Sequence, residues 1–229
     1  MSLVVQKILI LLVVIGLFVP SMAQNQFNVG LNFMTAFPQD EFKDNVDQVG
    51  FGGSLDFVYR LSESPLGVGA YIAYLVYGSE TRREPFSLTI PDVVVDVTTT
   101  NSIILGHLLF RVQPGRGSVQ PYVDGMLGFT LLSTDTRIED VDDDDEIASS
   151  NNMRDTAFSY GFGGGLKVRV HEFDMGDNEF EEKMGTLFID IGVRYIRGGE
   201  AEYRKEGSQE VKRSDTPLVT GHLGVSMAF

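Results

Sequence analysis

Two histidines are the residues of this chain whose type could most readily support catalysis. His107 and His222 each stand between a glycine and a leucine. With an acid and a serine such as Ser226, a histidine can serve as the general base of a hydrolase, and two histidines could form half of a metal site. No spacing in the sequence places a nucleophile, a base and an orienting acid together. We therefore assign no catalytic residue and expect both histidines to be satisfied by neighbouring polar groups.

An acidic run between residues 135 and 155 is the second candidate, with nine Asp or Glu residues against two Arg. Within it, Asp140, Asp142 and Asp144 could offer carboxylate oxygens to calcium. The calcium loop of an EF-hand needs glycine where Asp145 stands, so that match fails. We predict a solvated, disordered segment and no cofactor. The alternative is a loose calcium-binding or lipopolysaccharide-bridging role.

The composition excludes several classes of protein. The chain has 229 residues, a formal net charge of −14 and no cysteine. Without cysteine there is no disulfide scaffold, no thiolate metal site and no cysteine nucleophile. The charge and the lack of a Lys/Arg-rich stretch argue against a nucleic-acid partner, because phosphate neutralisation needs clustered basic residues.

The N-terminal segment predicts export. A single lysine precedes the apolar run 8–19, and small residues follow that run. This pattern indicates a secretory signal peptide over residues 1–23, cleaved after Ala23, which leaves residues 24–229 as one domain. The run is shorter than the roughly 20 apolar residues that a membrane-anchoring helix needs. If the mature chain enters a membrane, it must therefore do so as a closed β-barrel.

Two-residue periodicity dominates the mature chain. Phe27, Val29, Leu31 and Phe33 alternate with polar residues and glycine, and seven further segments show the same alternation. Those segments begin near residues 49, 66, 104, 119, 158, 187 and 219. One face of the eight segments carries no charged or strongly polar side chain. The pattern predicts eight antiparallel strands with one wholly apolar face.

The other face and the connections decide which way the apolar face points. The second face is only about 17% charged, against about 25–35% for a soluble surface, and it is rich in glycine. Long connections alternate with mostly short ones, as in outer-membrane barrels. The long ones are 37–48, 77–100, 133–157 and 197–216, and the others are 62–65, 114–118 and a longer 171–186. We predict an all-β, eight-stranded, antiparallel up-and-down transmembrane β-barrel.

The inward face of such a barrel would carry charges of both signs. These residues are Asp56, Arg60, Arg111, Asp124, Lys167, Arg169, Asp190 and Arg194. An eight-stranded barrel is just wide enough for side chains to fill, and buried charges must be paired. We predict a salt-bridged charge network that plugs the lumen. A narrow ion path is the alternative, and five positive against three negative groups would make it weakly anion-preferring.

Four short motifs carry a resemblance to a known family. They are Gly50-Phe51-Gly52-Gly53-Ser54-Leu55-Asp56-Phe57, Gln120-Pro121-Tyr122-Val123, Tyr160-Gly161-Phe162-Gly163-Gly164-Gly165-Leu166 and Val225-Ser226-Met227-Ala228-Phe229. With these the chain resembles the small eight-stranded outer-membrane barrels of the OmpA/OmpX type, and the porin-like β-barrel proteins of Bacteroidetes. The resemblance implies that Phe229 forms part of the signal read by the barrel-assembly machinery, and that the protein lies among the lipids of the cell outer membrane.

Together these features predict a structural or interaction protein. We expect a barrel, monomeric, that displays acidic loops and contributes to envelope integrity, adhesion or a larger outer-membrane assembly with an unidentified protein partner. The alternative is a narrow pore for ions or small solutes, and a lipid-modifying membrane enzyme is a more distant one.

Overall fold

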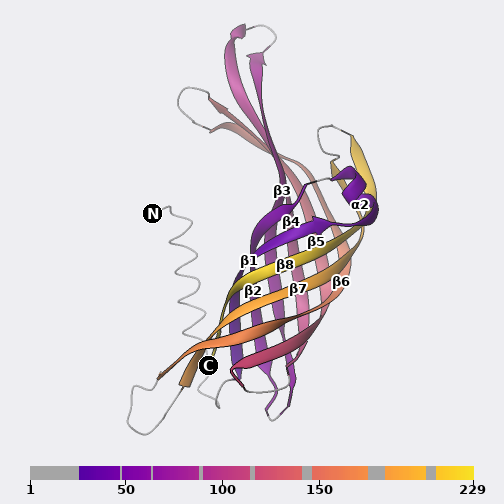
Figure 1. Ribbon diagram of the computed structural model, residues 1–229. Coiled ribbons are helices and arrows are strands. Elements are labelled where there is room, and N and C mark those ends of the chain that lie inside the picture. The colour runs from indigo at the N-terminus through magenta and orange to yellow at the C-terminus, as the bar shows by residue number, and fades with distance from the viewer. Residues whose placement is uncertain are drawn as a thin grey trace.

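The computed structural model describes residues 26–46, 48–62, 64–87, 90–113, 117–140, 146–174, 184–204 and 210–229. These residues form a closed barrel in which eight antiparallel strands follow one another in chain order (Figure 1). The predicted fold class is therefore confirmed. The predicted signal peptide and residues 141–145 of the acidic run lie outside the described residues.

The strands differ widely in length. Their bounds are β1 Phe27–Pro38, β2 Gly50–Arg60, β3 Leu66–Ser87, β4 Ile90–Val112, β5 Val119–Asp140, β6 Glu146–Asp174, β7 Met184–Arg204 and β8 Val211–Ala228. One short helix, α2, spans Asp40–Asn45. No helix of the described residues is long and apolar enough to cross a membrane.

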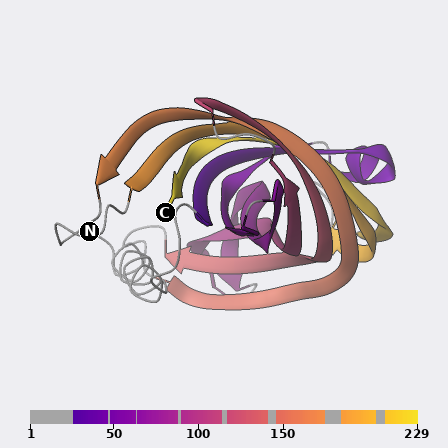
Figure 2. The ribbon, with the colours of Figure 1, turned by 90° about the horizontal axis from the view of Figure 1, so that it is seen from below.

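The barrel closes where the first strand meets the last. β1 pairs antiparallel with β8 from Asn28 opposite Ala228 to Pro38 opposite Leu218. Beyond this ladder, Phe27 and Phe229 exchange two backbone hydrogen bonds of 2.9 Å each. Viewed along its axis, the sheet curls around a lumen (Figure 2), and the end of the chain at Phe229 lies at one rim.

Burial follows the two-residue period with the apolar face outward. Leu108, Val123 and Phe162 are 62%, 61% and 64% exposed, whereas the intervening polar residues are buried. A water-soluble barrel would have the reverse arrangement, because burial of apolar surface drives its folding. The exposed apolar band therefore fits a barrel whose outer surface is solvated by lipid.

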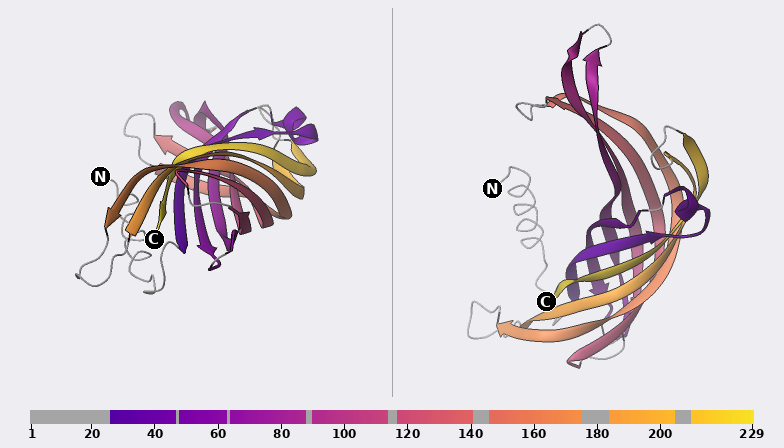
Figure 3. Two further views of the ribbon diagram at one scale, coloured as in Figure 1. Left: turned by 60° about the horizontal axis from the view of Figure 1, so that its bottom comes forward. Right: turned by 45° about the horizontal axis from the view of Figure 1, so that its top comes forward.

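The connections predicted as long loops are largely strand. β3 and β4 remain paired as far as Ser87 opposite Ile90, and β5 and β6 as far as Glu139 opposite Glu146. The prediction of a disordered 135–155 segment is thus wrong for the part that the structure describes. Most described side chains of these extensions are exposed or half-buried, so backbone pairing without an apolar period forms them. Figure 3 shows them continuing the wall well beyond the barrel.

The connection 37–48 is not a plain loop either, because it contains α2. Phe42 of this helix is fully buried and points its ring at Tyr77 and Tyr203 of the barrel wall. One buried ring in a six-residue helix leaves no helical period in the sequence, so periodicity could not reveal it.

Candidate functional site

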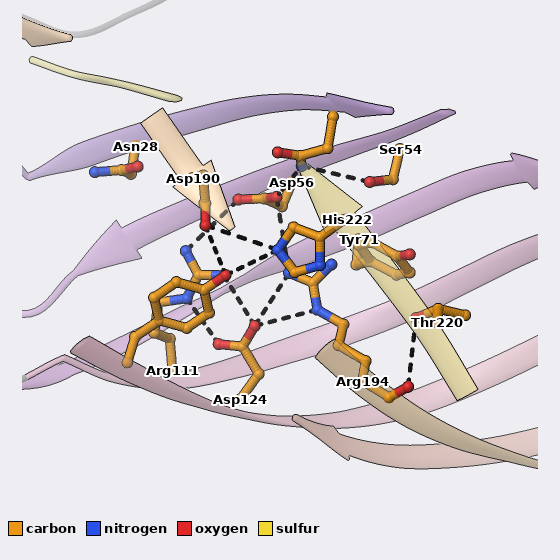
Figure 4. Close-up of polar contacts among 12 residues, drawn as sticks. Asn28, Ser54, Asp56, Tyr71, Arg111, Asp124, Asp190, Arg194, Thr220 and His222 are labelled. Carbon is orange, nitrogen blue, oxygen red and sulfur yellow. Dashed lines mark hydrogen bonds and ion pairs between the residues drawn. The ribbon is translucent and has the colours of Figure 1, made fainter. Parts of the chain in front are cut away.

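Buried polar side chains from seven of the strands meet inside the barrel (Figure 4). We call the following set the lumen network: Asp56, Tyr71, Arg111, Tyr122, Asp124, Lys167, Asp190, Arg194 and His222. Each of them is at most 5% exposed. Strands β2 to β8 supply them at inward positions of the two-residue period, so residues distant in sequence converge on one space.

Asp124 lies at the centre of the network. Arg111, its register partner on β4, donates from Nε to Oδ1 at 2.7 Å and from Nη2 to Oδ2 at 2.9 Å. Arg194 on β7 donates from Nη2 to Oδ2 at 3.1 Å. One carboxylate thus joins two guanidinium groups that would otherwise repel each other.

Asp56 is a second carboxylate facing the same two arginines. Its oxygens lie 3.6 Å from Arg111 Nη1 and 3.8 Å from Arg194 Nη2. Asn32 of β1 donates a hydrogen bond to Asp56 Oδ1 at 3.0 Å. The two arginines are therefore held between two aspartates, which ties β2 to β4, β5 and β7 across the lumen.

Asp190 forms the third anionic position. It accepts a hydrogen bond of 2.8 Å from the Tyr122 hydroxyl, and Lys167 Nζ lies 3.7 Å away. The Tyr122 hydroxyl is also 2.9 Å from His222 Nε2. Lys167 donates to Asn28 Oδ1 as well. This part of the network ties β5 to β6, β7, β8 and β1.

The carboxylates and cationic groups of the lumen network balance in number. They are Asp56, Asp124 and Asp190 against Arg111, Lys167 and Arg194. The predicted residues Arg60 and Arg169 do not join them. Arg169 is part-exposed at the rim, where it pairs with Glu172 and donates to Ser118. Arg60 is half-buried at the last position of β2. Both stand at the correct face but at the wrong depth, so the predicted excess of positive charge is absent from the described network.

Two tyrosines complete the network and were not predicted from the sequence. The Arg111 guanidinium lies 4.0 Å from the centre of the Tyr122 ring, and that of Arg194 lies 4.6 Å from the centre of Tyr71. Such cation–π contacts are strongest where water is excluded. The alternation in the sequence shows that both tyrosines face inward, but it does not show which cation each ring contacts.

Glycines on the inner wall provide the space for these long side chains. A Cβ on Gly30 would lie 2.8 Å from the carboxylate oxygens of Asp56, and one on Gly163 would lie 2.5 Å from Arg194 Cγ. A Cβ on Gly165 would lie 2.5 Å from the Tyr122 hydroxyl. A side chain at any of these three positions would collide with the lumen residue opposite, so each position requires glycine.

His107 lies outside the lumen network and pairs with a serine. Its Nε2 lies 2.8 Å from Ser159 Oγ, and both residues are buried. His222 contacts Tyr122 and Asp190 rather than Ser226. The two histidines therefore belong to separate contacts, and neither contacts Ser226, the candidate nucleophile.

A largely apolar layer fills the lumen next to the network. Met34, Leu75, Ile103 and Leu105 are buried in it. Phe42 covers this layer from α2, with its ring centre 4.8 Å from that of Tyr203 and 6.0 Å from that of Tyr77. Asn45 of the same helix donates to the Tyr203 hydroxyl at 3.1 Å. The lumen is thus filled at two levels, first by charge pairs and then by apolar side chains under a helix.

The predicted metal candidates cannot be placed. Asp142 and Asp144 lie outside the described residues, and only the backbone of Asp140 is described. Within the described part of the chain, no group of three His, Cys, Asp or Glu side chains is arranged to hold a metal ion.

The β3–β4 hairpin is the most prominent projection of the molecule (Figure 1). Hydroxyl pairs cross it, with Thr81 and Thr98 at 2.9 Å. Arg82 donates two hydrogen bonds to Glu80, which lowers the pKa of that carboxyl from its usual value. Polar side chains therefore join the two strands across the described part of this hairpin.

A family model for the outer membrane protein beta-barrel domain matches residues 9–212. The chain belongs to this family. An outer-membrane location follows from that membership, and it agrees with the apolar outer surface of the barrel. No curated protein matches this outer-membrane barrel.

Solved structures similar to this barrel are outer-membrane proteins with little sequence identity. Neisserial surface protein A is 12% identical, with 90% of this chain and 98% of that chain covered and a TM-score of 0.42. A major outer membrane protein from Thermus thermophilus is 12% identical, with 89% and 99% covered and a TM-score of 0.40. The attachment invasion locus protein of Yersinia pestis, solved with the heparin analogue sucrose octasulfate, is 12% identical, with 90% and 100% covered and a TM-score of 0.36.

Proposed function

We propose that this outer-membrane barrel is a non-conducting scaffold that displays its long hairpins as an interaction surface. It would contribute to envelope integrity, adhesion or a larger outer-membrane assembly as a structural protein without enzymatic activity. The observation that carries the proposal is the filling of the lumen, because Arg111 and Arg194 are fully buried in ion pairs at its centre.

Two features support the scaffold. The charge pairs and the apolar layer under Phe42 occupy the lumen in series, and an eight-stranded barrel leaves little space beside its side chains. The long β3–β4 and β5–β6 hairpins leave the barrel at the end opposite Phe229. In outer-membrane barrels the longer connections are extracellular, which would place these hairpins outside the cell.

Planar-bilayer recording of the purified, folded protein tests whether the barrel is closed. We expect no channel events with the native chain. Steady conductance would instead support the narrow pore for ions or small solutes that is the alternative function.

Exchange of the projecting part of the β3–β4 hairpin tests the interaction surface. In a variant that replaces residues 79–99 with a short turn, we expect the barrel to fold and its recovery of surface partners by cross-linking in cells to fall. A matched variant that exchanges Lys212 and Glu210, an exposed ion pair of the shorter β7–β8 hairpin, should recover the same partners as the native chain. Unchanged cross-linking in the hairpin variant would contradict the proposal.

A further inference from the structure

Arg154 is an exposed arginine on the outer face of β6. Read along β6 towards the long hairpins, the outward positions before Arg154 are Phe162, Tyr160, Phe158 and Thr156. The side chains of all four are exposed. The series changes from apolar to polar at Thr156. Arg154 is thus the first charged group on the lipid-facing side of β6 in the direction of the long hairpins.

Within the part of the chain that the structure describes, no acidic side chain forms an ion pair with Arg154; the nearby Asp135 accepts a hydrogen bond from Ser133, the register partner of Arg154. The neighbouring Asp155 is engaged elsewhere, because its Oδ1 accepts from the Thr156 amide and its Oδ2 from the Glu202 amide, both at 2.8 Å. Other exposed arginines above the barrel have partners. Arg197, for example, lies 3.0 Å from Asp215.

The strand geometry gives the height of Arg154 in the membrane. Outward apolar residues on β6 extend from Val170 to Phe158. At about 3.3 Å per residue and a tilt of about 35–45°, this series spans roughly 30 Å, close to the apolar band of an outer-membrane barrel. Arg154 then lies about 10 Å beyond Phe158, at the level of lipid headgroups.

Aromatic side chains support this placement. Phe158 packs edge-on against Phe129 of β5, with ring centres 6.2 Å apart, and Tyr160 lies one outward position further into the band. Aromatic residues form girdles at the two borders of the membrane. Arg154 is therefore immediately outside the girdle on the hairpin side, which is the outer leaflet in the orientation given above.

We propose that Arg154 binds a phosphate group of an outer-leaflet lipid whose acyl chains lie along the aromatic surface below it. A guanidinium offers paired N–H donors that match phosphate oxygens, and those of Arg154 have no hydrogen-bond partner among the described side chains. The lipid would be oriented by two contacts at once, a charged one at Arg154 and apolar ones at Phe158 and Phe129. This site does not depend on whether the lumen conducts.

Native mass spectrometry of the folded protein tests the site with defined lipids. The probes are lipid A carrying two phosphates, the same lipid A after dephosphorylation, and phosphatidylglycerol. We expect the native chain to retain the phosphorylated lipids and Arg154→Gln to bind them about tenfold more weakly, since one charge-assisted hydrogen-bonded contact is lost. Retention of both phosphorylated lipids would identify a site for phosphate of either source, and retention of lipid A alone a site specific to it.

Two variants keep the result interpretable. Arg197→Gln removes an arginine that already has Asp215 as its partner, so it should bind the lipids like the native chain. Arg154→Lys keeps the charge and should recover part of the affinity. Heat-modifiable gel migration confirms that each variant is folded. Equal retention by the native chain and Arg154→Gln, or equal retention of lipid A with and without phosphate, would overturn the proposal.

Discussion

Arg111 and Asp124 face each other directly across the β4–β5 ladder and are joined by two parallel hydrogen bonds of 2.7 and 2.9 Å. Because they are register partners, the backbone ladder sets their separation without help from a loop. The ion pair at the centre of the lumen is therefore positioned by the most regular part of the fold, and Arg194 and Asp56 assemble around it.

Removal of Arg111 should destabilise the barrel strongly. We expect Arg111→Met to lower the free energy of unfolding by about 3–5 kcal/mol, because Asp124 would keep a buried charge with only one cation in contact. Urea unfolding in lipid vesicles, followed by circular dichroism, measures the change. The double variant Arg111→Met/Asp124→Leu should regain much of the loss. At the surface, Arg197→Met should cost at most about 1 kcal/mol. Equal effects of the two single variants would contradict the role of the lumen network.

A methyl group on the inner wall should have a different effect from one on the outer wall. A Cβ at Gly163 would lie 2.5 Å from both Arg194 Cγ and the Val193 carbonyl oxygen. We expect Gly163→Ala to lower stability by about 1–3 kcal/mol through overpacking. Gly106 is the matched control, since a Cβ there meets no heavy atom within 4 Å, and Gly106→Ala should stay within about 0.5 kcal/mol of the native value. The free energy of unfolding of both variants is measured as for Arg111→Met. An unchanged value for Gly163→Ala would contradict the close packing of Arg194 against the inner wall.

Loss of the Phe42 ring should loosen the outer end of the lumen without opening it. Phe42→Ala removes the packing on Tyr203 and Tyr77, so amide hydrogen exchange in α2 should rise. Planar-bilayer recordings should remain silent, because the lumen network is untouched. Glu41→Ala, an exposed change in the same helix, should alter neither readout. Channel events in Phe42→Ala would mean that α2, and not the charge network, closes the barrel.

The last residue should matter for assembly as well as for stability. Deletion of Phe229 removes both 2.9 Å hydrogen bonds that it exchanges with Phe27, each worth about 0.5–1.5 kcal/mol. We expect less heat-resistant folded protein in cells and slower accumulation of it on gels. Phe229→Tyr keeps the ring and the backbone pairing and should assemble normally. Unimpaired assembly of the deletion would argue against recognition of Phe229 by the assembly machinery.

The sequence predicts the barrel well because alternation reports the face of each side chain. Counting along the strands shows that Asp56, Arg111 and Asp124 all face the lumen. Depth along the barrel axis does not follow, because it depends on the stagger between strands. For this reason Arg169 was assigned to the network although it lies at the rim.

Two further features left no periodic trace. Most described side chains in the outer halves of β3 and β4 are exposed or half-buried, so these strands are defined by backbone pairing, which a one-dimensional pattern does not report. The partners of Tyr122, His222 and Asp190, from three different strands, likewise depend on the closed geometry. Contacts that require three strands to converge can be found only in the folded chain.

The β1–β8 ladder has a consequence for biogenesis. It joins Asn28 to Ala228, so β1 has both of its neighbouring strands only once the chain includes β8. Until β8 is present, one edge of β1 keeps unpaired backbone N–H and C=O groups. A chain that is cut before β8 therefore leaves two open sheet edges, which the interior of a membrane does not tolerate, so such a truncation should abolish the barrel and not merely shorten it.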